Sequence, residues 1–211
     1  MSGDLNFTSQ DLLAYEGGYR KLVGRNLSLD LAGFYDIYSH LVTEELGAAN
    51  LSYKPNIHIV TPVMAGNKMA GNSHGLEFTA SWKALQRWKI TGSYSWLDMH
   101  LHLLPGSTDT TSVADEAESP QHQAQIHSFL DLPRKFELDT ALYFRGSLPS
   151  WDIPPYTRLD IRAGWRWAEH AEVSLVGQNL LSGKQLEAIA KSELPATSIH
   201  RSIFGRVTWR F

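Results

Sequence analysis

Apolar and polar residues alternate along most of this chain, and the pattern is easily seen at its end. In residues 202–211 the odd positions are mostly apolar and the even positions are polar. The apolar set is Ile203, Val207, Trp209 and Phe211. A period of two indicates a strand with one apolar face. A final strand of this kind suits a membrane β-barrel, whose last strand must pair to leave no open edge, and an edge strand of a soluble sandwich is the alternative.

The same alternation predicts eight earlier strands. They cover residues 12–22, 27–42, 75–83, 88–96, 123–132, 135–145, 158–167 and 173–181. In residues 75–83, for example, Leu76, Phe78 and Trp82 alternate with polar residues. Residues 43–73 form a long connection, and its extended piece near residues 57–63 has no clear place. The pattern therefore predicts nine or ten strands.

The connections between these strands alternate in length. Tight turns fall near residues 24, 86, 133 and 169, and long connections follow residues 43, 103, 146 and 181. Bacterial outer-membrane barrels have short periplasmic turns and long external loops. Tryptophans also lie near strand ends, as in the interfacial girdles of membrane proteins; they are Trp88, Trp96, Trp165, Trp167 and Trp209. We therefore predict an all-β fold, an antiparallel transmembrane β-barrel.

The composition of the chain excludes several classes of protein. Of the 211 residues, 43% are hydrophobic and only 19% are charged, and cysteine is absent. No segment approaches the roughly 18 apolar residues of a membrane-spanning helix. A net charge of −3 without a basic run argues against a nucleic-acid partner. Residues 1–10 lack the features of a secretory signal, so we expect the chain to be part of something longer.

Two groups of residues resemble catalytic or metal sites. Asp98, His100 and His102 share one strand face, but their parity continues the apolar face, and we predict no metal site there. Ser150 and Asp152 have no nucleophile elbow around them, which argues against an outer-membrane protease or phospholipase. We predict that the chain is not an enzyme and holds no cofactor.

The polar face carries charges of both signs. They include Glu16, Arg20, Asp30, Asp36, Glu77, Lys89, Glu137, Asp139, Arg145, Arg158, Asp160, Arg162, Arg166, Arg206 and Arg210. Isolated charges in a dry interior are costly, so this surface must be solvated or ion-paired.

Seven runs, in order, carry a family resemblance: NFTSQDLLAYEGGYR, LSLDLAGFYDIYSHLVT, HGLEFTASW, WKITGSYSWLDM, LDIRAGWRW, VSLVGQNLL and FGRVTWRF. Together they resemble the C-terminal half of a TonB-dependent outer-membrane receptor. The resemblance implies that residues 1–211 are the last nine or ten strands of a 22-stranded barrel. It also implies a plug domain, through which the TonB-ExbB-ExbD complex would act, and neither the plug nor its TonB-binding segment is found in this sequence.

The resemblance implies uptake of a scarce solute, such as a ferric siderophore, across the outer membrane of a Gram-negative bacterium. We expect Trp151 and Tyr156, in external loops, to contact this ligand. Trp209 and Phe211 are expected to serve barrel closure and recognition by the barrel-assembly machinery, and the apolar face to contact lipid and lipopolysaccharide. The alternative is a small self-contained barrel with a passive or structural role, for which residues 57–63 could supply a tenth strand.

Overall fold

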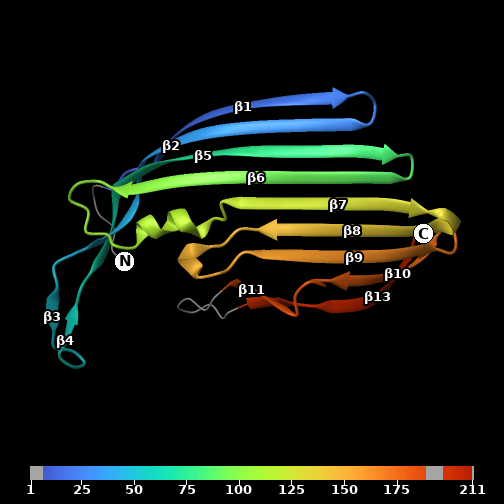
Figure 1. Cartoon of the computed structure of the whole chain (residues 1–211). Helices are drawn as coiled ribbons and strands as arrows, with labels where there is room; N and C mark the ends of the chain where they lie inside the picture. Colours follow the sequence, from blue (N-terminus) through green and yellow to red (C-terminus); the bar gives the residue numbers. More distant parts are fainter. Residues whose placement is uncertain (1–6, 189–196, 211) are drawn as a thin grey trace. The chain divides into compact units, whose positions relative to one another are not determined.

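The main feature of the computed structural model, which describes residues 7–188 and 197–210, is a nine-stranded sheet (Figure 1). Its strands are β1 (Asp11–Val23), β2 (Leu27–Leu46), β5 (Val63–Leu85), β6 (Trp88–Leu103), β7 (His122–Leu132), β8 (Phe136–Arg145), β9 (Tyr156–Arg166), β10 (Ala171–Gln178) and β13 (Ser202–Trp209). Their order in the sheet is their order in the chain. The predicted antiparallel barrel wall is confirmed as a partial barrel, with β1 and β13 at its two edges.

Short elements fill the connections. β3 (Asn50–Ser52) pairs with β4 (His58–Val60), and β11 (Lys184–Ala188) pairs with β12 (Thr197–His200). Three 3-10 helices are η1 (Ser112–Glu118), η2 (Pro133–Lys135) and η3 (Pro149–Trp151). Because β4 belongs to a separate two-stranded sheet, the suggestion that residues 57–63 supply a tenth wall strand is wrong. None of the described helices is long and apolar enough to cross a membrane.

Three wall strands are longer than predicted. β2 continues to Leu46, β6 continues to Leu103, and β5 begins at Val63 rather than at Gly75. The early part of β5 is rich in Gly, Ala and Asn, which have low strand propensity, so local pattern does not predict a strand there. Close backbone contact explains one of these glycines. A Cβ atom at Gly71 would lie 2.3 Å from the carbonyl oxygen of His100, so only glycine fits there.

Short turns connect the strands at one end of the wall, which we call the short-turn end. They lie at residues 24–26, 86–87, 133–135 and 167–170, in agreement with the predicted turns. Gly24 has a φ of 62° and Arg134 a φ of 61°, so both adopt the left-handed conformation that tight turns require. We call the opposite end, where β8 stops at Arg145 and β9 starts at Tyr156, the long-loop end.

The register fixes which residues share a face. β8 and β9 pair antiparallel as predicted, with Leu142 opposite Leu159 and Leu138 opposite Ala163. Between these pairs, Asp139 lies opposite Arg162 on the other face. One face of the sheet is therefore apolar and the other is polar, as the alternation predicted.

The apolar face has no protein core behind it. Among the described residues, the buried apolar side chains are Met69, Ile153 and Ala171. Large apolar side chains of β13 are instead exposed, with 71% of Val207 and 56% of Trp209 accessible. In a soluble protein this surface would be costly, whereas lipid covers such a face in a membrane barrel.

The chain divides into two compact units. Among the described residues, one comprises residues 7–16, 34–74 and 98–119, and the other comprises residues 17–33, 75–97, 120–188 and 197–210. The first unit contains the β3–β4 hairpin and helix η1, and the second contains the four short turns and strands β7 to β13.

Candidate functional site

An ion-pair network centred on Arg162 crosses the polar face of β8, β9 and β10. The Arg162 guanidinium lies 2.7 Å from Asp139 Oδ2 and 3.0 Å from Glu137 Oε2, and it also contacts Glu172. Arg166 contacts the other carboxylate oxygen of Glu137. All the partners except Arg166 have side chains less than about a third exposed, where a charge without a partner would be costly. The charged side chains of the polar face therefore form ion pairs with one another on these three strands.

Asp160 connects β9 to the end of β10. Its carboxylate accepts hydrogen bonds from Arg158 Nη2 at 2.6 Å and from the backbone N–H of Asn179 at 2.9 Å. The Arg158 guanidinium also lies 5.6 Å from the ring centroid of Tyr143, within the range of a cation–π contact. These contacts hold the polar face in place next to the long-loop end.

A pocket of about 280 Å³ lies on the polar face at the long-loop end. It is lined by Ser93, Ser95, Gln123, Ala124, Gln125, Tyr143, Phe144, Arg145 and Tyr156. The register places Arg145 opposite Tyr156, and the Arg145 guanidinium lies 4.6 Å from the centre of the Tyr156 ring. Tyr156 was expected in an external loop, whereas the structure places it at the start of β9. Arg145 was expected only as one of the charges of the polar face.

Two donors of the Arg145 guanidinium have no hydrogen-bond partner among the described residues. They are the Nε and Nη2 atoms, and both are buried. Hydroxyl and amide groups of Ser95, Gln123 and Gln125 line the same pocket. A guanidinium beside neutral donors suits an anionic, oxygen-rich molecule.

Trp151 lies in the loop between β8 and β9. Leu148 and Ile153 close this loop with two backbone hydrogen bonds, of 2.9 Å and 3.2 Å, and the Ile153 side chain is buried. Asp152 follows η3 with a φ of 49°, which reverses the chain. Trp151 is not among the residues that line the pocket, so of the two predicted contact residues the structure brings only Tyr156 to it.

Of the two residues predicted to serve barrel closure, Trp209 is the last residue of β13. Trp209 is opposite Ala171 of β10, and β13 is the last strand in the sheet order. Phe211 lies outside the described residues. A role of Trp209 and Phe211 in closure or assembly stays a prediction.

Asp98 contacts His100, as its place in the sequence suggested, but its second partner in the structure is His74. Asp98 Oδ2 lies 3.1 Å from His100 Nε2 and 3.7 Å from Nε2 of His74 on β5. His74 in turn packs near Tyr35, with the ring centroids 6.1 Å apart. Within residues 7–188 and 197–210, no group of three or more His, Cys, Asp or Glu side chains is arranged to hold a metal ion.

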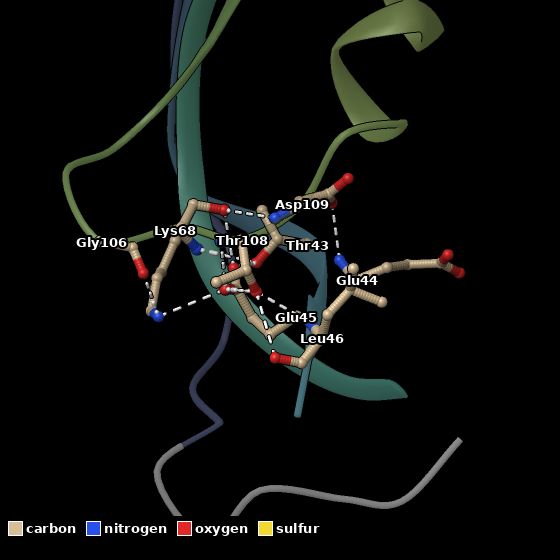
Figure 2. Close-up of polar contacts among 9 residues, drawn as sticks. Thr43, Glu44, Glu45, Leu46, Lys68, Gly106, Thr108 and Asp109 are labelled. Atoms are coloured by element: carbon tan, nitrogen blue, oxygen red, sulfur yellow. Dashed lines mark hydrogen bonds and ion pairs between the residues drawn. The ribbon is translucent and has the colours of Figure 1, made fainter. Parts of the chain in front are cut away.

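Sequence analysis missed a polar cluster, here named the Glu45 cluster, in which the buried side chains of Thr43 and Glu45 contact Lys68, Ser107 and Thr108. Figure 2 shows Thr43, Glu45, Lys68 and Thr108 of this cluster. The Glu45 carboxylate accepts hydrogen bonds from the Thr43 hydroxyl at 2.7 Å, the Ser107 hydroxyl at 2.8 Å and the Thr108 backbone N–H at 2.8 Å. Lys68 Nζ lies 3.3 Å from it and donates a second hydrogen bond to the carbonyl of Gly106. The cluster holds the loop after β6 against β2 and β5.

A spanning strand needs about 9–11 residues, whereas β2 has 20. Because β2 starts at a short turn and Glu45 is its second-to-last residue, Glu45 lies beyond the part of the strand that crosses the hydrocarbon layer. Burial alone would raise the pKa of Glu45, but the hydrogen bonds from Thr108, Thr43 and Ser107 outweigh it and lower this pKa from 4.5 to about 2. Gly66 leaves room for the carboxylate, since a Cβ atom there would lie 2.8 Å from Glu45 Cγ. Glu45 is therefore ionised at neutral pH.

Asp109 makes a second set of contacts beside Glu45 (Figure 2). Its carboxylate accepts hydrogen bonds from the backbone N–H groups of Glu44, Thr111 and Ser112, and from the Ser112 hydroxyl. Burial would raise the pKa of Asp109, but these donors hold it well below its usual range. Asp109 thus joins the start of η1 to the end of β2.

Comparison with known proteins identifies the family. Residues 2–180 match the family model described as TonB dependent receptor-like, beta-barrel. This chain belongs to the TonB-dependent receptor β-barrel family. None of the curated proteins matches it in sequence.

Solved structures share the fold of this family member. The ferric-catecholate import receptor Fiu from E. coli K12 matches with a TM-score of 0.73 and 15% identity over 99% of this chain and 29% of its own. The copper transporter OprC matches with a TM-score of 0.67 and 11% identity over 98% and 33%. The ferric yersiniabactin uptake receptor FyuA from Yersinia pestis matches with a TM-score of 0.67 and 14% identity over 96% and 30%. The chain therefore spans about a third of the length of these proteins.

Proposed function

We propose that this chain forms part of the barrel wall and external loops of a TonB-dependent receptor that takes up a ferric siderophore across the outer membrane of a Gram-negative bacterium. The observation that carries the proposal is the pair of Arg145 and Tyr156 in the pocket at the long-loop end. This pair offers a cation and an aromatic ring on the polar face, where a solute would pass through a barrel of this family.

The pocket favours an anionic iron chelate over a bare metal ion. Arg145 carries a permanent positive charge, which would repel a free cation and attract a chelate with exposed oxygen atoms. Fiu and FyuA are described as ferric-chelate importers and OprC as a copper transporter, so the fold alone does not choose the solute. The donors around Arg145 support the siderophore class.

The partners follow from the same proposal. Energy for uptake would come from the TonB-ExbB-ExbD complex, acting through a plug in the full-length receptor. The apolar face would contact outer-membrane lipid and, at its outer rim, lipopolysaccharide. The barrel-assembly machinery would recognise the C-terminal segment that contains Trp209 and Phe211.

The test is binding of a ferric catecholate to the full-length receptor carrying Tyr156→Ala or Arg145→Gln. Loss of a charge-assisted hydrogen bond costs about 1.5–3 kcal/mol, so we expect the Arg145 variant to bind roughly 10- to 100-fold more weakly. Trp151→Ala tests the second predicted contact in the same assay.

Tyr94→Ala is the matched control, because Tyr94 lies on the other face of the sheet, opposite Ala124. Affinity is measured per assembled receptor, so that a loss of assembly does not count as a loss of binding. If the Arg145 and Tyr156 variants bind like the control, the pocket is not the binding site and the proposal loses its main support.

A further inference from the structure

Two arginines and two tyrosines alternate on the polar face at the pocket of the long-loop end. Where β8 pairs with β9, Arg145 is opposite Tyr156, and two residues further along the strands Tyr143 is opposite Arg158. The guanidinium carbon of Arg145 lies 4.6 Å from the Tyr156 ring centre, and that of Arg158 lies 5.6 Å from the Tyr143 ring centre. Residues two apart on a strand share a face, so all four side chains lie on one side of the sheet. We call these four residues the Arg–Tyr quartet.

The two arginines of the quartet differ in charge compensation. Arg158 donates two hydrogen bonds to the Asp160 carboxylate, from Nε at 2.9 Å and from Nη2 at 2.6 Å. The two side chains are only 23% and 16% exposed, so solvent screens this pair less than a surface pair. In Arg145 the same two atoms, Nε and Nη2, have no hydrogen-bond partner among the described residues. One positive charge of the quartet is therefore neutralised, and the other is not.

Asp160 is held in place without using the pocket. It lies two residues after Arg158 on β9, and its partner on β8 is Ala141, which supplies no charged group. From the other side, the backbone N–H of Asn179 donates a hydrogen bond of 2.9 Å to its Oδ1 atom. Asp160 is not among the residues that line the pocket, so it affects a bound solute through Arg158 and through its charge.

We propose that Asp160 is a specificity-determining residue of the pocket at the long-loop end. By neutralising Arg158, it leaves Arg145 to act alone on the solute, since Arg145 is the only charged residue among the described residues that line this pocket. The pocket then suits a ferric chelate that presents a single anionic group. A second uncompensated arginine would instead favour chelates of higher negative charge, because Coulomb attraction increases with the charge of the ligand. The inference rests on the proposed function, because it takes this pocket as the siderophore site.

A purely structural role of Asp160 predicts the opposite sign. Asparagine has the shape of aspartate, and its oxygen can still accept the hydrogen bond from Asn179, but it carries no charge. If Asp160 sets the charge of the pocket, Asp160→Asn strengthens the binding of a highly charged chelate. If Asp160 only holds Arg158 in place, the same substitution weakens the binding.

The experiment measures binding of a ferric tris-catecholate, which carries three negative charges, to the full-length receptor assembled in cells. Asp160→Asn leaves Arg158 uncompensated and should bind this chelate about tenfold more tightly at low salt, the order expected for one added charge about 10 Å from a trianion. Arg158→Gln leaves Asp160 uncompensated and should bind it more weakly by a similar factor. The double variant, Arg158→Gln with Asp160→Asn, should return close to the wild-type affinity.

Asp30→Asn is the matched control, because it makes the same change in another Arg–Asp pair of the polar face, with Arg20, on strands that do not line the pocket. Its affinity should equal that of the wild type. Affinity is measured per assembled receptor. If one single variant is not assembled, comparison of the other with the double variant still gives the sign of the charge effect.

Salt separates a charge effect from a change of shape. The differences between the variants should shrink when salt is raised from about 50 mM to about 500 mM, because salt screens charges. Unchanged or weaker binding by Asp160→Asn, a double variant weaker than both single variants, or differences that persist at high salt would overturn the inference. If Arg145→Gln also binds like the wild type, or if the wild type binds no catecholate, the proposed function fails as well; weaker binding by Arg145→Gln alone leaves the proposed function standing.

Discussion

The Glu45→Gln substitution tests whether the Glu45 cluster holds the loop after β6. The side chain is 9% exposed, and its two oxygens accept hydrogen bonds from Thr43, Ser107 and Thr108. Glutamine has the same shape, but one oxygen becomes an NH₂ group that faces donors and cannot accept from them. The substitution also removes the charge opposite Lys68. We therefore expect the loop to open more often while the sheet stays folded.

Two routes give a similar magnitude. The pKa of Glu45 falls from 4.5 to about 2 in the folded protein. At about 1.4 kcal/mol per pKa unit, this amounts to roughly 3 kcal/mol of preference for the charged form. Alternatively, the loss of one or two charge-assisted hydrogen bonds, at about 1.5–3 kcal/mol each, gives about 2–4 kcal/mol. Opening of the loop should therefore become about 100-fold more frequent, since about 1.4 kcal/mol is a factor of ten.

Acid should have the same effect on the wild-type protein. Because the folded pKa of Glu45 lies below its ordinary value, the stabilisation is fully present above pH 4.5. It is lost as pH falls from 4.5 through about 2, where the folded carboxylate takes up a proton. The Glu45→Gln variant lacks this carboxylate, so acid should destabilise its loop less.

Hydrogen exchange measured by mass spectrometry on the assembled receptor gives the opening frequency. The informative amides are those of Thr108, bonded to Glu45, and Glu44, bonded to Asp109. Glu44→Gln is the control, because the Glu44 side chain is exposed and the charge change is the same. Equal exchange in the Glu45 and Glu44 variants would refute the assigned role. So would faster exchange that extends throughout β7 to β10, because it would indicate general unfolding.

Two further predictions concern the wall itself. Leu138→Arg should destabilise the assembled barrel by about 2–4 kcal/mol if this residue lies at the bilayer midplane, because Leu138 is on the apolar face; unfolding in urea measures this, and an unchanged midpoint would contradict the facing. Deleting Phe211 from a full-length receptor should lower the amount exposed at the cell surface, measured by antibody, and leave ferric catecholate affinity per assembled molecule unchanged. Normal assembly with weaker binding would contradict this role.

The faces and the turns of the wall could be predicted from the sequence because they depend on local pattern. Alternation of period two places Leu142 and Leu159 on one face, whatever the rest of the sheet does. Tight turns at Gly24 and Arg134 need special backbone conformations, which short polar runs indicate. Both features were therefore found before the structure.

The lengths of β2, β5 and β6 could not be predicted in the same way. The early residues of β5 are held by contacts with neighbouring segments, as in the hydrogen bond from the N–H of Leu104, just after β6, to the carbonyl of Lys68, rather than by their own strand propensity. Pairing between distant segments overrides local preference, so the predicted connection of residues 43–73 contained parts of the two wall strands β2 and β5 as well as the hairpin of β3 and β4.

The candidate sites depend on register and on distant contacts. Arg145 contacts Tyr156 because the two residues lie opposite each other where β8 pairs with β9. This register could not be predicted from the sequence. Glu45 meets Ser107 across 62 residues of chain. Neither their distance in sequence nor their residue types predicted these contacts. One signal was present: Glu45 occupies a position of β2 at which the alternation predicts an apolar residue, and this could have indicated a buried carboxylate.

The order of strands in the sheet, which follows the order in the chain, has a consequence for how such walls can change in evolution. Each strand needs only its two neighbours in sequence for its backbone hydrogen bonds. A duplication or loss of one hairpin would therefore keep every remaining strand beside a suitable partner and would leave each face on its own side. A wall of this design can grow or shrink by whole hairpins, and a sheet with crossover connections cannot do so without rerouting its chain.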